Sequence, residues 1–122
     1  MTSNQLPAPR LGELVAVVRR HGDALVIQAA GEIDVVTAPQ LAEAIAGASA
    51  QPADAVVVDL TEVTFLGSAG LAVLVGAQEQ VGDRGFRIVA GTTIVLRSLM
   101  VTGLTDVLDA FPTLDAALAA RA

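Results

Sequence analysis

Short runs of β-branched and other apolar residues recur along this chain and predict its strands. Residues 14–19 and 24–29 are two such runs, and the turn between them, at residues 20–23, contains a glycine. This spacing is typical of an antiparallel hairpin. Three later runs are also predicted to be strands: residues 55–60, 86–90 and 106–111.

Between these runs, apolar residues recur every three or four positions, which indicates helices. The first predicted helix begins at Thr37, which we expect to cap it together with Gln40. Pro39 falls in the first turn of that helix, where its missing N–H costs nothing. Further helices are predicted from Ser68 to about Gly82, from Thr93 to Thr102, and from Thr113 onward.

The predicted element order is ββαβαβαβα. Strands that alternate with helices form a largely parallel sheet, so the order predicts one α/β domain: a mixed, mostly parallel sheet with an N-terminal hairpin and about four helices. Residues 1–10 are polar and contain two prolines, and we expect them to form a flexible leader before a domain at residues 11–122. The longest apolar stretches are far shorter than the roughly 20 residues that a membrane span requires.

The composition argues against several classes of function. Thirteen acidic and seven basic residues give a net charge of −6, which disfavours binding to the phosphate backbone of nucleic acids. The chain has no Cys or Lys and only one His, His21, so thiolate and lysine chemistry are excluded and a His-based triad or metal site is disfavoured. Without Trp or Tyr, it also lacks aromatic platforms for stacking bases. We therefore do not expect an enzyme.

Ser68 is the residue with the clearest chemical potential. It follows the strand at residues 55–60 and a short connector, and it starts a helix between Gly67 and Gly70, where little bulk shields its hydroxyl. The hydroxyl could cap the helix, or it could accept a phosphoryl group, whose charge a helix N-terminus tolerates. A nucleophilic role is disfavoured because the Gly-x-Ser-x-Gly spacing is absent and His21 lies in a distant turn. The pattern alone does not choose between cap and phosphoacceptor.

Residues 56–74, VVVDLTEVTFLGSAGLAVL, resemble the signature of the STAS domain, which anti-sigma factor antagonists share with sulfate-transporter tails. Residues 31–41, GEIDVVTAPQL, resemble the other landmark of that family. The resemblance extends from about Leu14 to Leu118 and implies that residues 11–122 form a single STAS domain.

The resemblance also implies a function. Ser68 matches the phosphoacceptor of the family, and Asp34 matches the acid of its Gly-Glu-x-Asp motif, near the partner surface. The implied partner-binding residues are Asp34, Gly67, Ser68, Ala69 and Gly70. The unmodified protein would bind an anti-sigma factor that is itself a serine kinase, and so free a sigma factor for transcription. Phosphorylation at Ser68 would end the interaction, and a PP2C-type phosphatase would restore it. ATP belongs to the kinase, so the resemblance implies no cofactor for this chain, which is expected to act in the cytoplasm without inserting into a membrane.

Two positions depart from the family pattern. Gly67 stands where the family has an Asp before the phosphoacceptor, and Ala69 replaces its second hydroxyl residue. The missing carboxylate removes charge repulsion against a phosphate, but it also removes a candidate contact for the kinase. These changes leave open a constitutive or differently regulated antagonist.

Two other functions are compatible with the sequence. A cytoplasmic STAS subunit of a membrane lipid-transport ABC complex is the main alternative to the antagonist. A nucleotide or small-molecule sensor is weaker, because the chain has no glycine-rich phosphate cradle.

Two further features bear on binding. Glu32, Asp34, Asp59 and Glu62 match no defined metal-binding spacing, so no metal is expected, and Asp59 is predicted to be a half-buried acid held by backbone donors. The helix at residues 93–102 has more apolar residues than one buried face needs, which predicts either an exposed docking patch or fuller burial. Those apolar residues are Val95, Leu96, Leu99, Met100 and Val101.

Overall fold

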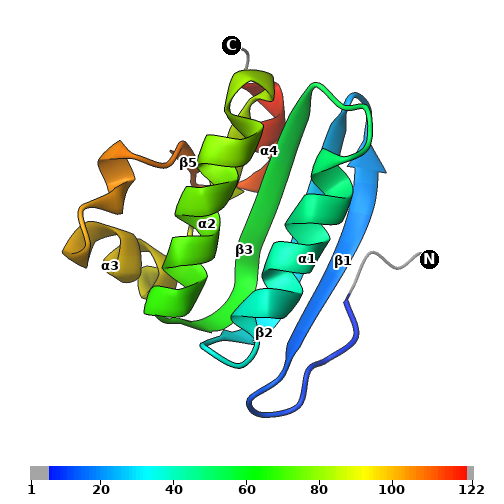
Figure 1. Cartoon of the computed structure of the whole chain (residues 1–122). Helices are drawn as coiled ribbons and strands as arrows, with labels where there is room; N and C mark the ends of the chain where they lie inside the picture. The colour runs from blue at the N-terminus through cyan, green and yellow to red at the C-terminus, as the bar shows by residue number, and fades with distance from the viewer. Residues whose placement is uncertain (1–5, 121–122) are drawn as a thin grey trace.

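The computed structural model describes residues 6–120, which contain one five-stranded sheet whose strand order follows the chain (Figure 1). The strands are β1 (Leu14–His21), β2 (Ala24–Ile33), β3 (Ala55–Leu66), β4 (Phe86–Val89) and β5 (Ala110–Phe111). β1 pairs antiparallel with β2 in the predicted hairpin, and β2 to β5 run parallel to one another. The predicted fold class is therefore confirmed.

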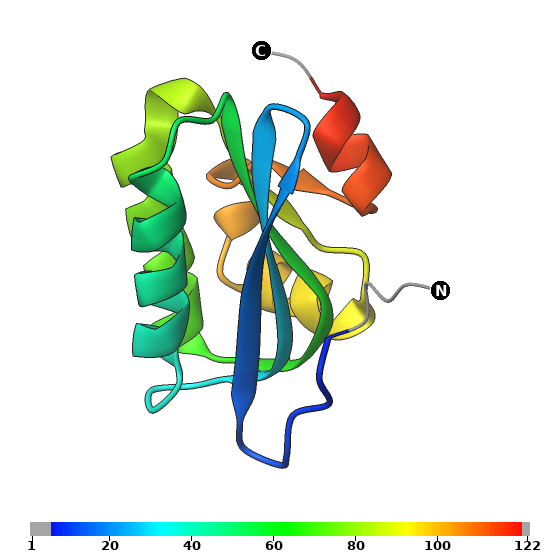
Figure 2. The same ribbon diagram turned by 90° about the vertical axis from the view of Figure 1, so that its right-hand side faces the viewer.

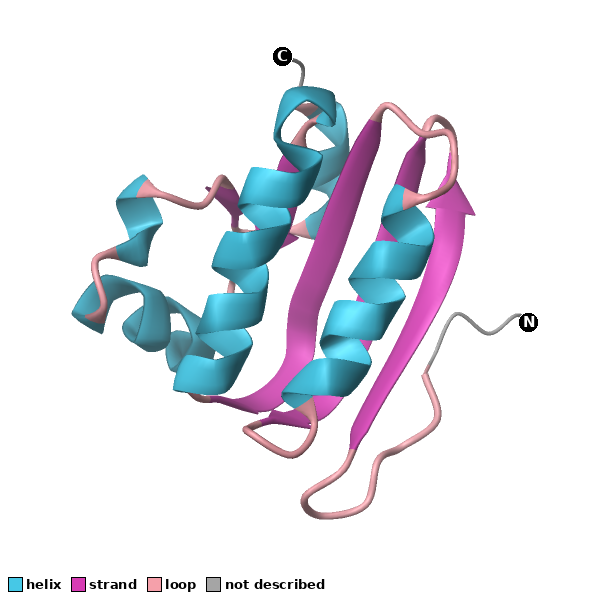
Figure 3. Ribbon diagram, viewed as in Figure 1, coloured by secondary structure: helices cyan, strands magenta, loops and turns pink. Residues whose placement is uncertain are grey.

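Four helices connect and follow the strands (Figure 3). They are α1 (Ala38–Ser49), α2 (Ser68–Val81), α3 (Thr93–Val101) and α4 (Leu114–Ala119), with short 3-10 turns at Gly82–Arg84 and Leu104–Asp106. Figure 2 shows the sheet nearly edge-on, with α1 and α2 covering one face and α4 on the other. We call the face away from α1 and α2 the far face. In the described residues, no helix is long and apolar enough to cross a membrane.

The alternation of side chains along the strands builds two apolar cores. Val56, Val58 and Leu60 of β3 point into the main core beneath α1 and α2. Val57 points the opposite way, into a smaller cluster with Val26 on the far face. Phe111, Leu114 and Leu118 pack on that smaller cluster. A central strand covered on both faces is apolar without interruption, which explains the continuous run at residues 55–60.

β3 is longer than predicted, because residues 61–66 continue the strand instead of forming a connector. Its buried residues Leu60, Val63 and Leu66 recur at every third position. Two register shifts against β2 interrupt the usual alternation and produce this spacing, so the period-2 signal disappears from the sequence. The prediction for β5 was also too long, since part of residues 106–111 belongs to the turn before it.

The predicted division into a leader at residues 1–10 and a domain at residues 11–122 stays a prediction. Residues 1–5 and 121–122 lie outside the described residues. Within the described part of the leader, the Arg10 N–H donates to Glu13 Oε1 at 3.1 Å, and residues 6–11 lie against β2 and β3.

Candidate functional site

Two loops that carry the predicted site residues meet at the carboxyl ends of β2 and β3. The Gly67 N–H donates to the carbonyl oxygen of Ile33 at 3.0 Å, which joins the loop after β3 to the loop after β2. Because neighbouring parallel strands end at the same edge of a sheet, Asp34 and residues 67–70 lie on one end of the molecule (Figure 1). The structure thus brings all five predicted site residues together.

Ser68 is the first residue of α2 and is exposed. Gly67, in an extended conformation, holds the N-cap position, so of the two alternatives for Ser68 the capping role is not the one observed. The Leu71 N–H bonds to the Gly67 carbonyl at 3.1 Å and is the first to close the helix. The N–H groups of residues 68–70 have no acceptor within the helix, and no hydrogen bond between described residues engages the Ser68 hydroxyl.

Asp34 shapes the loop in front of α1. Its Oδ1 accepts hydrogen bonds from the N–H groups of Val36 and Thr37 at 2.9 and 3.0 Å. The bond from the Thr37 N–H is the largest influence and lowers the pKa of Asp34; partial desolvation opposes it, and the Val36 N–H adds to it. These hydrogen bonds favour the carboxylate form of Asp34, and they also hold the loop between β2 and α1 in place.

Thr37 does not make the predicted capping box with Gln40. The Thr37 hydroxyl lies 2.7 Å from the carbonyl oxygen of Glu32 and accepts the Asp34 N–H at 2.9 Å, so it closes the loop instead of capping the helix. Pro39 has no N–H to offer a cap, and the Gln40 N–H bonds to the Thr37 carbonyl. The Gln40 side chain reaches across to the carbonyl oxygen of Leu14 at 2.7 Å.

Gly67 and Gly70, on either side of Ser68, differ in the space available for a side chain. A Cβ at Gly70 would lie 2.5 Å from Ile33 Cγ2 and 2.8 Å from Leu66 Cδ1, so close packing of α2 requires glycine. A Cβ at Gly67 would lie 3.0 Å from the Phe65 ring, at a φ of −92° that any residue adopts. The ring of Phe65, a residue 49% exposed, therefore lies against the helix start beside Gly67.

Exposed apolar side chains surround Ser68 and Asp34. Val35 and Val36 are 77% and 80% exposed, and Phe65 lies just before Gly67. Sequence reasoning missed these three residues, although two adjacent valines in a turn, where polar residues are usual, are a signal. Their exposure marks this end of the molecule as a candidate protein interface.

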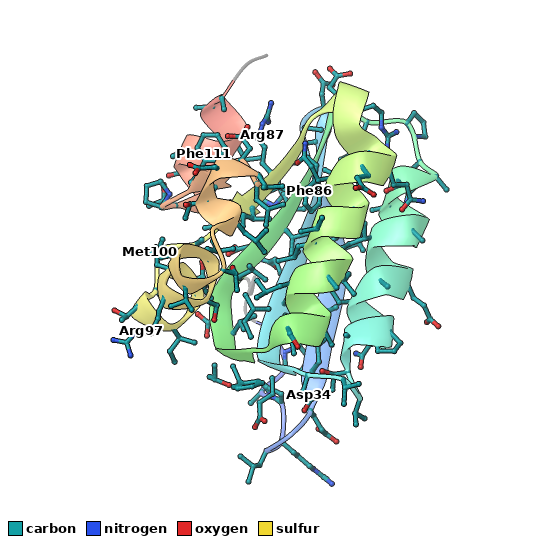
Figure 4. All side chains as sticks on the ribbon, turned by 60° about the vertical axis from the view of Figure 1, so that its left-hand side comes forward. Asp34, Phe86, Arg87, Arg97, Met100 and Phe111 are labelled. Atoms are coloured by element: carbon teal, nitrogen blue, oxygen red, sulfur yellow. The ribbon has the colours of Figure 1, made fainter. Side chains whose placement is uncertain are left out.

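α3 extends this apolar surface. The Ser98 hydroxyl lies 3.1 Å from the carbonyl oxygen of Leu66, which joins α3 to the end of β3. Val95 and Leu99 are buried, whereas Leu96, Met100 and Val101 are exposed. Figure 4 shows Met100 and Arg97 on the outer side of α3 and Asp34 at the lower end of the molecule. Of the two predicted outcomes for this helix, the exposed patch is the one observed, and its role in docking stays a prediction.

The other polar candidates lie elsewhere. His21 ends β1 at the hairpin, at the opposite end of the sheet from Ser68. Asp59 is more buried than predicted, with 9% of its surface exposed, and its Oδ1 accepts hydrogen bonds from the Thr61 N–H and hydroxyl at 3.0 and 2.6 Å. Among residues 6–120, no group of three or more His, Asp or Glu side chains is placed to hold a metal ion.

Comparison with known proteins gives a consistent result. The model of the STAS domain matches residues 15–117. The chain is 37% identical over 106 residues to the anti-sigma-F factor antagonist RsfB of Mycobacterium tuberculosis, covering 86% of this chain and 87% of that protein. It is 33% identical over 97 residues to an anti-sigma-B factor antagonist of Listeria monocytogenes, covering 78% and 85%. The crystal structure of an anti-sigma factor antagonist from Mycobacterium paratuberculosis matches with a TM-score of 0.85 and 39% identity, covering 90% of this chain and 95% of that one.

Proposed function

The chain belongs to the STAS domain family, and from that premise we propose that it is an anti-sigma factor antagonist switched by phosphorylation at Ser68. In this proposal the unmodified protein acts in the cytoplasm and binds an anti-sigma factor of the serine-kinase type. Binding through Asp34 and residues 67–70 frees a sigma factor for transcription. The kinase then phosphorylates Ser68 and ends the complex, and a PP2C-type phosphatase restores it.

The observation that carries the proposal is the position of the Ser68 hydroxyl. It is exposed at the start of α2, beside the Asp34 loop, and no described residue holds it in a hydrogen bond. A kinase can therefore reach it without unfolding the helix. A phosphate there adds about −1.5 to −2 charges, and the free N–H groups and dipole of the helix start stabilise that charge.

The surrounding apolar residues explain how a phosphate would end binding. A partner that covers Val36 and Phe65 also excludes water from the neighbouring Ser68. Burial of an ionised group without a matched cation is strongly unfavourable. The phosphate is thus tolerated by the free protein and not by the complex, which is the requirement for a switch.

A pull-down from native lysate tests the proposal, with Ser68→Ala and Ser68→Glu as baits. Ala46→Glu, which adds the same charge on the exposed side of α1, is the matched control. We expect a kinase-fold anti-sigma factor on the Ser68→Ala and Ala46→Glu baits and its loss from the Ser68→Glu bait, identified by mass spectrometry. The captured kinase with ATP should phosphorylate the wild-type chain at Ser68 and leave Ser68→Ala unmodified.

Two results would contradict this proposal. Equal capture of the anti-sigma factor by the Ser68→Ala and Ser68→Glu baits would remove the switch and leave a constitutive antagonist. Capture of the same membrane ATPase subunits by both baits would favour the role in a lipid-transport complex.

A further inference from the structure

The far face of the sheet contains a cavity that the proposed function does not use. α4 covers one end of this face, and residues 6–11 cross the other end (Figure 2). Between residues 6–11 and the strands β2 and β3 lies a cavity of about 700 Å³. This volume lies in the range of small-molecule sites in proteins.

The floor of this cavity is polar where a central sheet is usually apolar. Gln28 of β2 and Asp59 of β3 are direct neighbours in the sheet, two residues beyond the buried pair Val26 and Val57 on the same face. Arg19 of β1 donates its Nε–H to Gln28 Oε1 at 2.7 Å. A row of polar side chains thus crosses three strands, which apolar packing alone does not require.

Asp59 is a buried carboxylate without a charged partner among the described residues. Both donors to its Oδ1 come from Thr61, and no described residue donates to its Oδ2. The nearby guanidinium of Arg19 is directed to Gln28. A carboxylate with nine-tenths of its surface buried is costly unless a cation or several donors compensate it, and Asp59 lines the cavity.

A β-bulge places a second carboxylate beside Asp59. Gln28 pairs with Asp59 and Ala30 pairs with Glu62, so two steps along β2 match three steps along β3. The extra residue puts Glu62 on the same face as Asp59, about 7 Å further along the strand, a spacing of two ordinary residues. Without the bulge, Glu62 would point into the main core.

The other residues that line the cavity determine its charge and polarity, and so the kind of ligand it can bind. The third carboxylate, Glu32, accepts the Gly12 N–H at 2.8 Å, and Arg10 is the one cation among the described lining residues. Three carboxylates against one arginine leave the cavity with a negative charge. Leu6, Pro7, Pro9 and Ala30 add apolar wall. The cavity therefore combines negative charge at its floor with apolar sides.

We propose that this cavity binds a small aliphatic diamine, with one ammonium on Asp59, the other on Glu62, and the methylene chain against the proline-rich wall. A metal ion is not the ligand we propose, because among residues 6–120 no group of three or more Asp, Glu or His side chains is placed to hold one. None of the five candidate partner-binding residues lines the cavity, so the proposal does not depend on the switch at Ser68.

Isothermal titration of the full chain with butane-1,4-diamine at low salt tests the proposal. Asp59→Asn removes the charge but keeps the Oδ1 acceptor for Thr61, and Glu62→Gln changes an exposed side chain. Glu43→Gln, on the exposed side of α1, makes the same charge change away from the cavity. We expect saturable binding that weakens at least tenfold in Asp59→Asn and Glu62→Gln and stays unchanged in Glu43→Gln. Butane-1,4-diol and MgCl₂ should give no saturable heat.

Several results would overturn the proposal. These are no saturable heat from the wild-type protein, equal weakening in all three variants, or comparable binding of the diol or of Mg²⁺. Circular dichroism checks that each variant is folded. If Asp59→Asn does not fold, the proposal is tested by two results together. Glu62→Gln must lose binding, and the diamine must shift the amide resonances of Gln28 and Thr61 in the wild-type protein.

Discussion

At the scale of single residues, Gly70 determines how closely α2 approaches the ends of β2 and β3. Gly70→Ala is expected to lower the free energy of unfolding by about 1–3 kcal/mol, because the added methyl overlaps buried Ile33 and Leu66. Gly76→Ala, in the same helix with open space around its Cβ, should instead be neutral or stabilising by up to ~1 kcal/mol. Urea denaturation of both variants provides the comparison, and equal values would refute the packing argument.

Asp34 gives its loop a dependence on pH. Its pKa in the folded protein lies below the ordinary value of 3.8, so its contribution to loop stability is fully present above 3.8 and is lost as pH falls through the lowered value. The amide resonances of Val36 and Thr37 should therefore shift together in an acid NMR titration, with a midpoint below 3.8. In Asp34→Asn, which keeps the acceptor Oδ1, that shared transition should be absent. A midpoint at or above 3.8 would contradict the role of these hydrogen bonds.

The candidate residues Ser68 and Asp34 were chosen from sequence, their role in binding stays a prediction, and the errors at this scale have local causes. Ser68 and Asp34 could be identified because the motifs around them are continuous in the chain. Thr37 and Gln40 were assigned to a capping box because their spacing fits one, but the Thr37 hydroxyl accepts the Asp34 N–H and donates to the Glu32 carbonyl, and the Gln40 side chain donates to the Leu14 carbonyl. Such a choice depends on the path of the chain before the helix, which spacing alone does not encode.

At the scale of elements, the loop before α1 offers apolar contact beside Ser68. Val36→Ser is expected to weaken binding of the anti-sigma factor about tenfold, or about 1.4 kcal/mol, with little change in stability because the side chain is exposed. Val107→Ser removes another exposed valine, after the second 3-10 turn and away from Ser68, and should leave binding unchanged. Surface plasmon resonance with the captured anti-sigma factor measures both variants. If Val36→Ser and Val107→Ser bind the anti-sigma factor with equal affinity, the loop before α1 is not part of the interface.

The carboxyl end of α1 depends on an arginine from another element. Arg84 donates to the carbonyl oxygens of Ser49 and Gln51, both at 2.8 Å, where a cation also complements the helix dipole. Arg84→Met should lower the free energy of unfolding by about 1–2 kcal/mol. Arg97→Met, on the outer side of α3, is the control and should change it by less than ~0.5 kcal/mol. A similar effect of both changes in thermal unfolding would exclude a capping role.

The order of elements was predictable because seven of the eight connections between consecutive strands and helices begin or end at a glycine, proline or threonine, which interrupts the apolar period. The extent of β3 was not. Register shifts against β2 moved its buried residues to every third position, and a register is a property of two strands. The cavity beneath residues 6–11 escaped prediction for the same reason, since Gln28, Asp59 and Arg10 are neighbours only in the folded chain.

At the scale of the whole molecule, the net charge of −6 is unevenly distributed. Arg19, Arg20 and His21 share the hairpin end of the sheet with Asp23 and Asp54, so the charges there nearly balance, whereas Glu32 and Asp34 lie at the end that carries Ser68. The chain therefore offers an acidic, partly apolar end to a partner. In the proposed switch, a phosphate on Ser68 adds further negative charge to this end, and the complex would bury that charge without a matched cation.

The sheet order has a consequence for how the protein is made. Because every strand after β1 pairs with the strand that precedes it in the chain, the sheet can grow from the hairpin outward during synthesis, each parallel pair closing over one helical crossover of about 20 residues. The two loops that carry Asp34 and Ser68 are both in place once α2 has emerged, before β4 exists, and α3 joins this end later. The last segments to arrive, β5 and α4, then cover Val26, Val57 and Val89, so the growing chain keeps this small apolar surface open until synthesis is nearly finished.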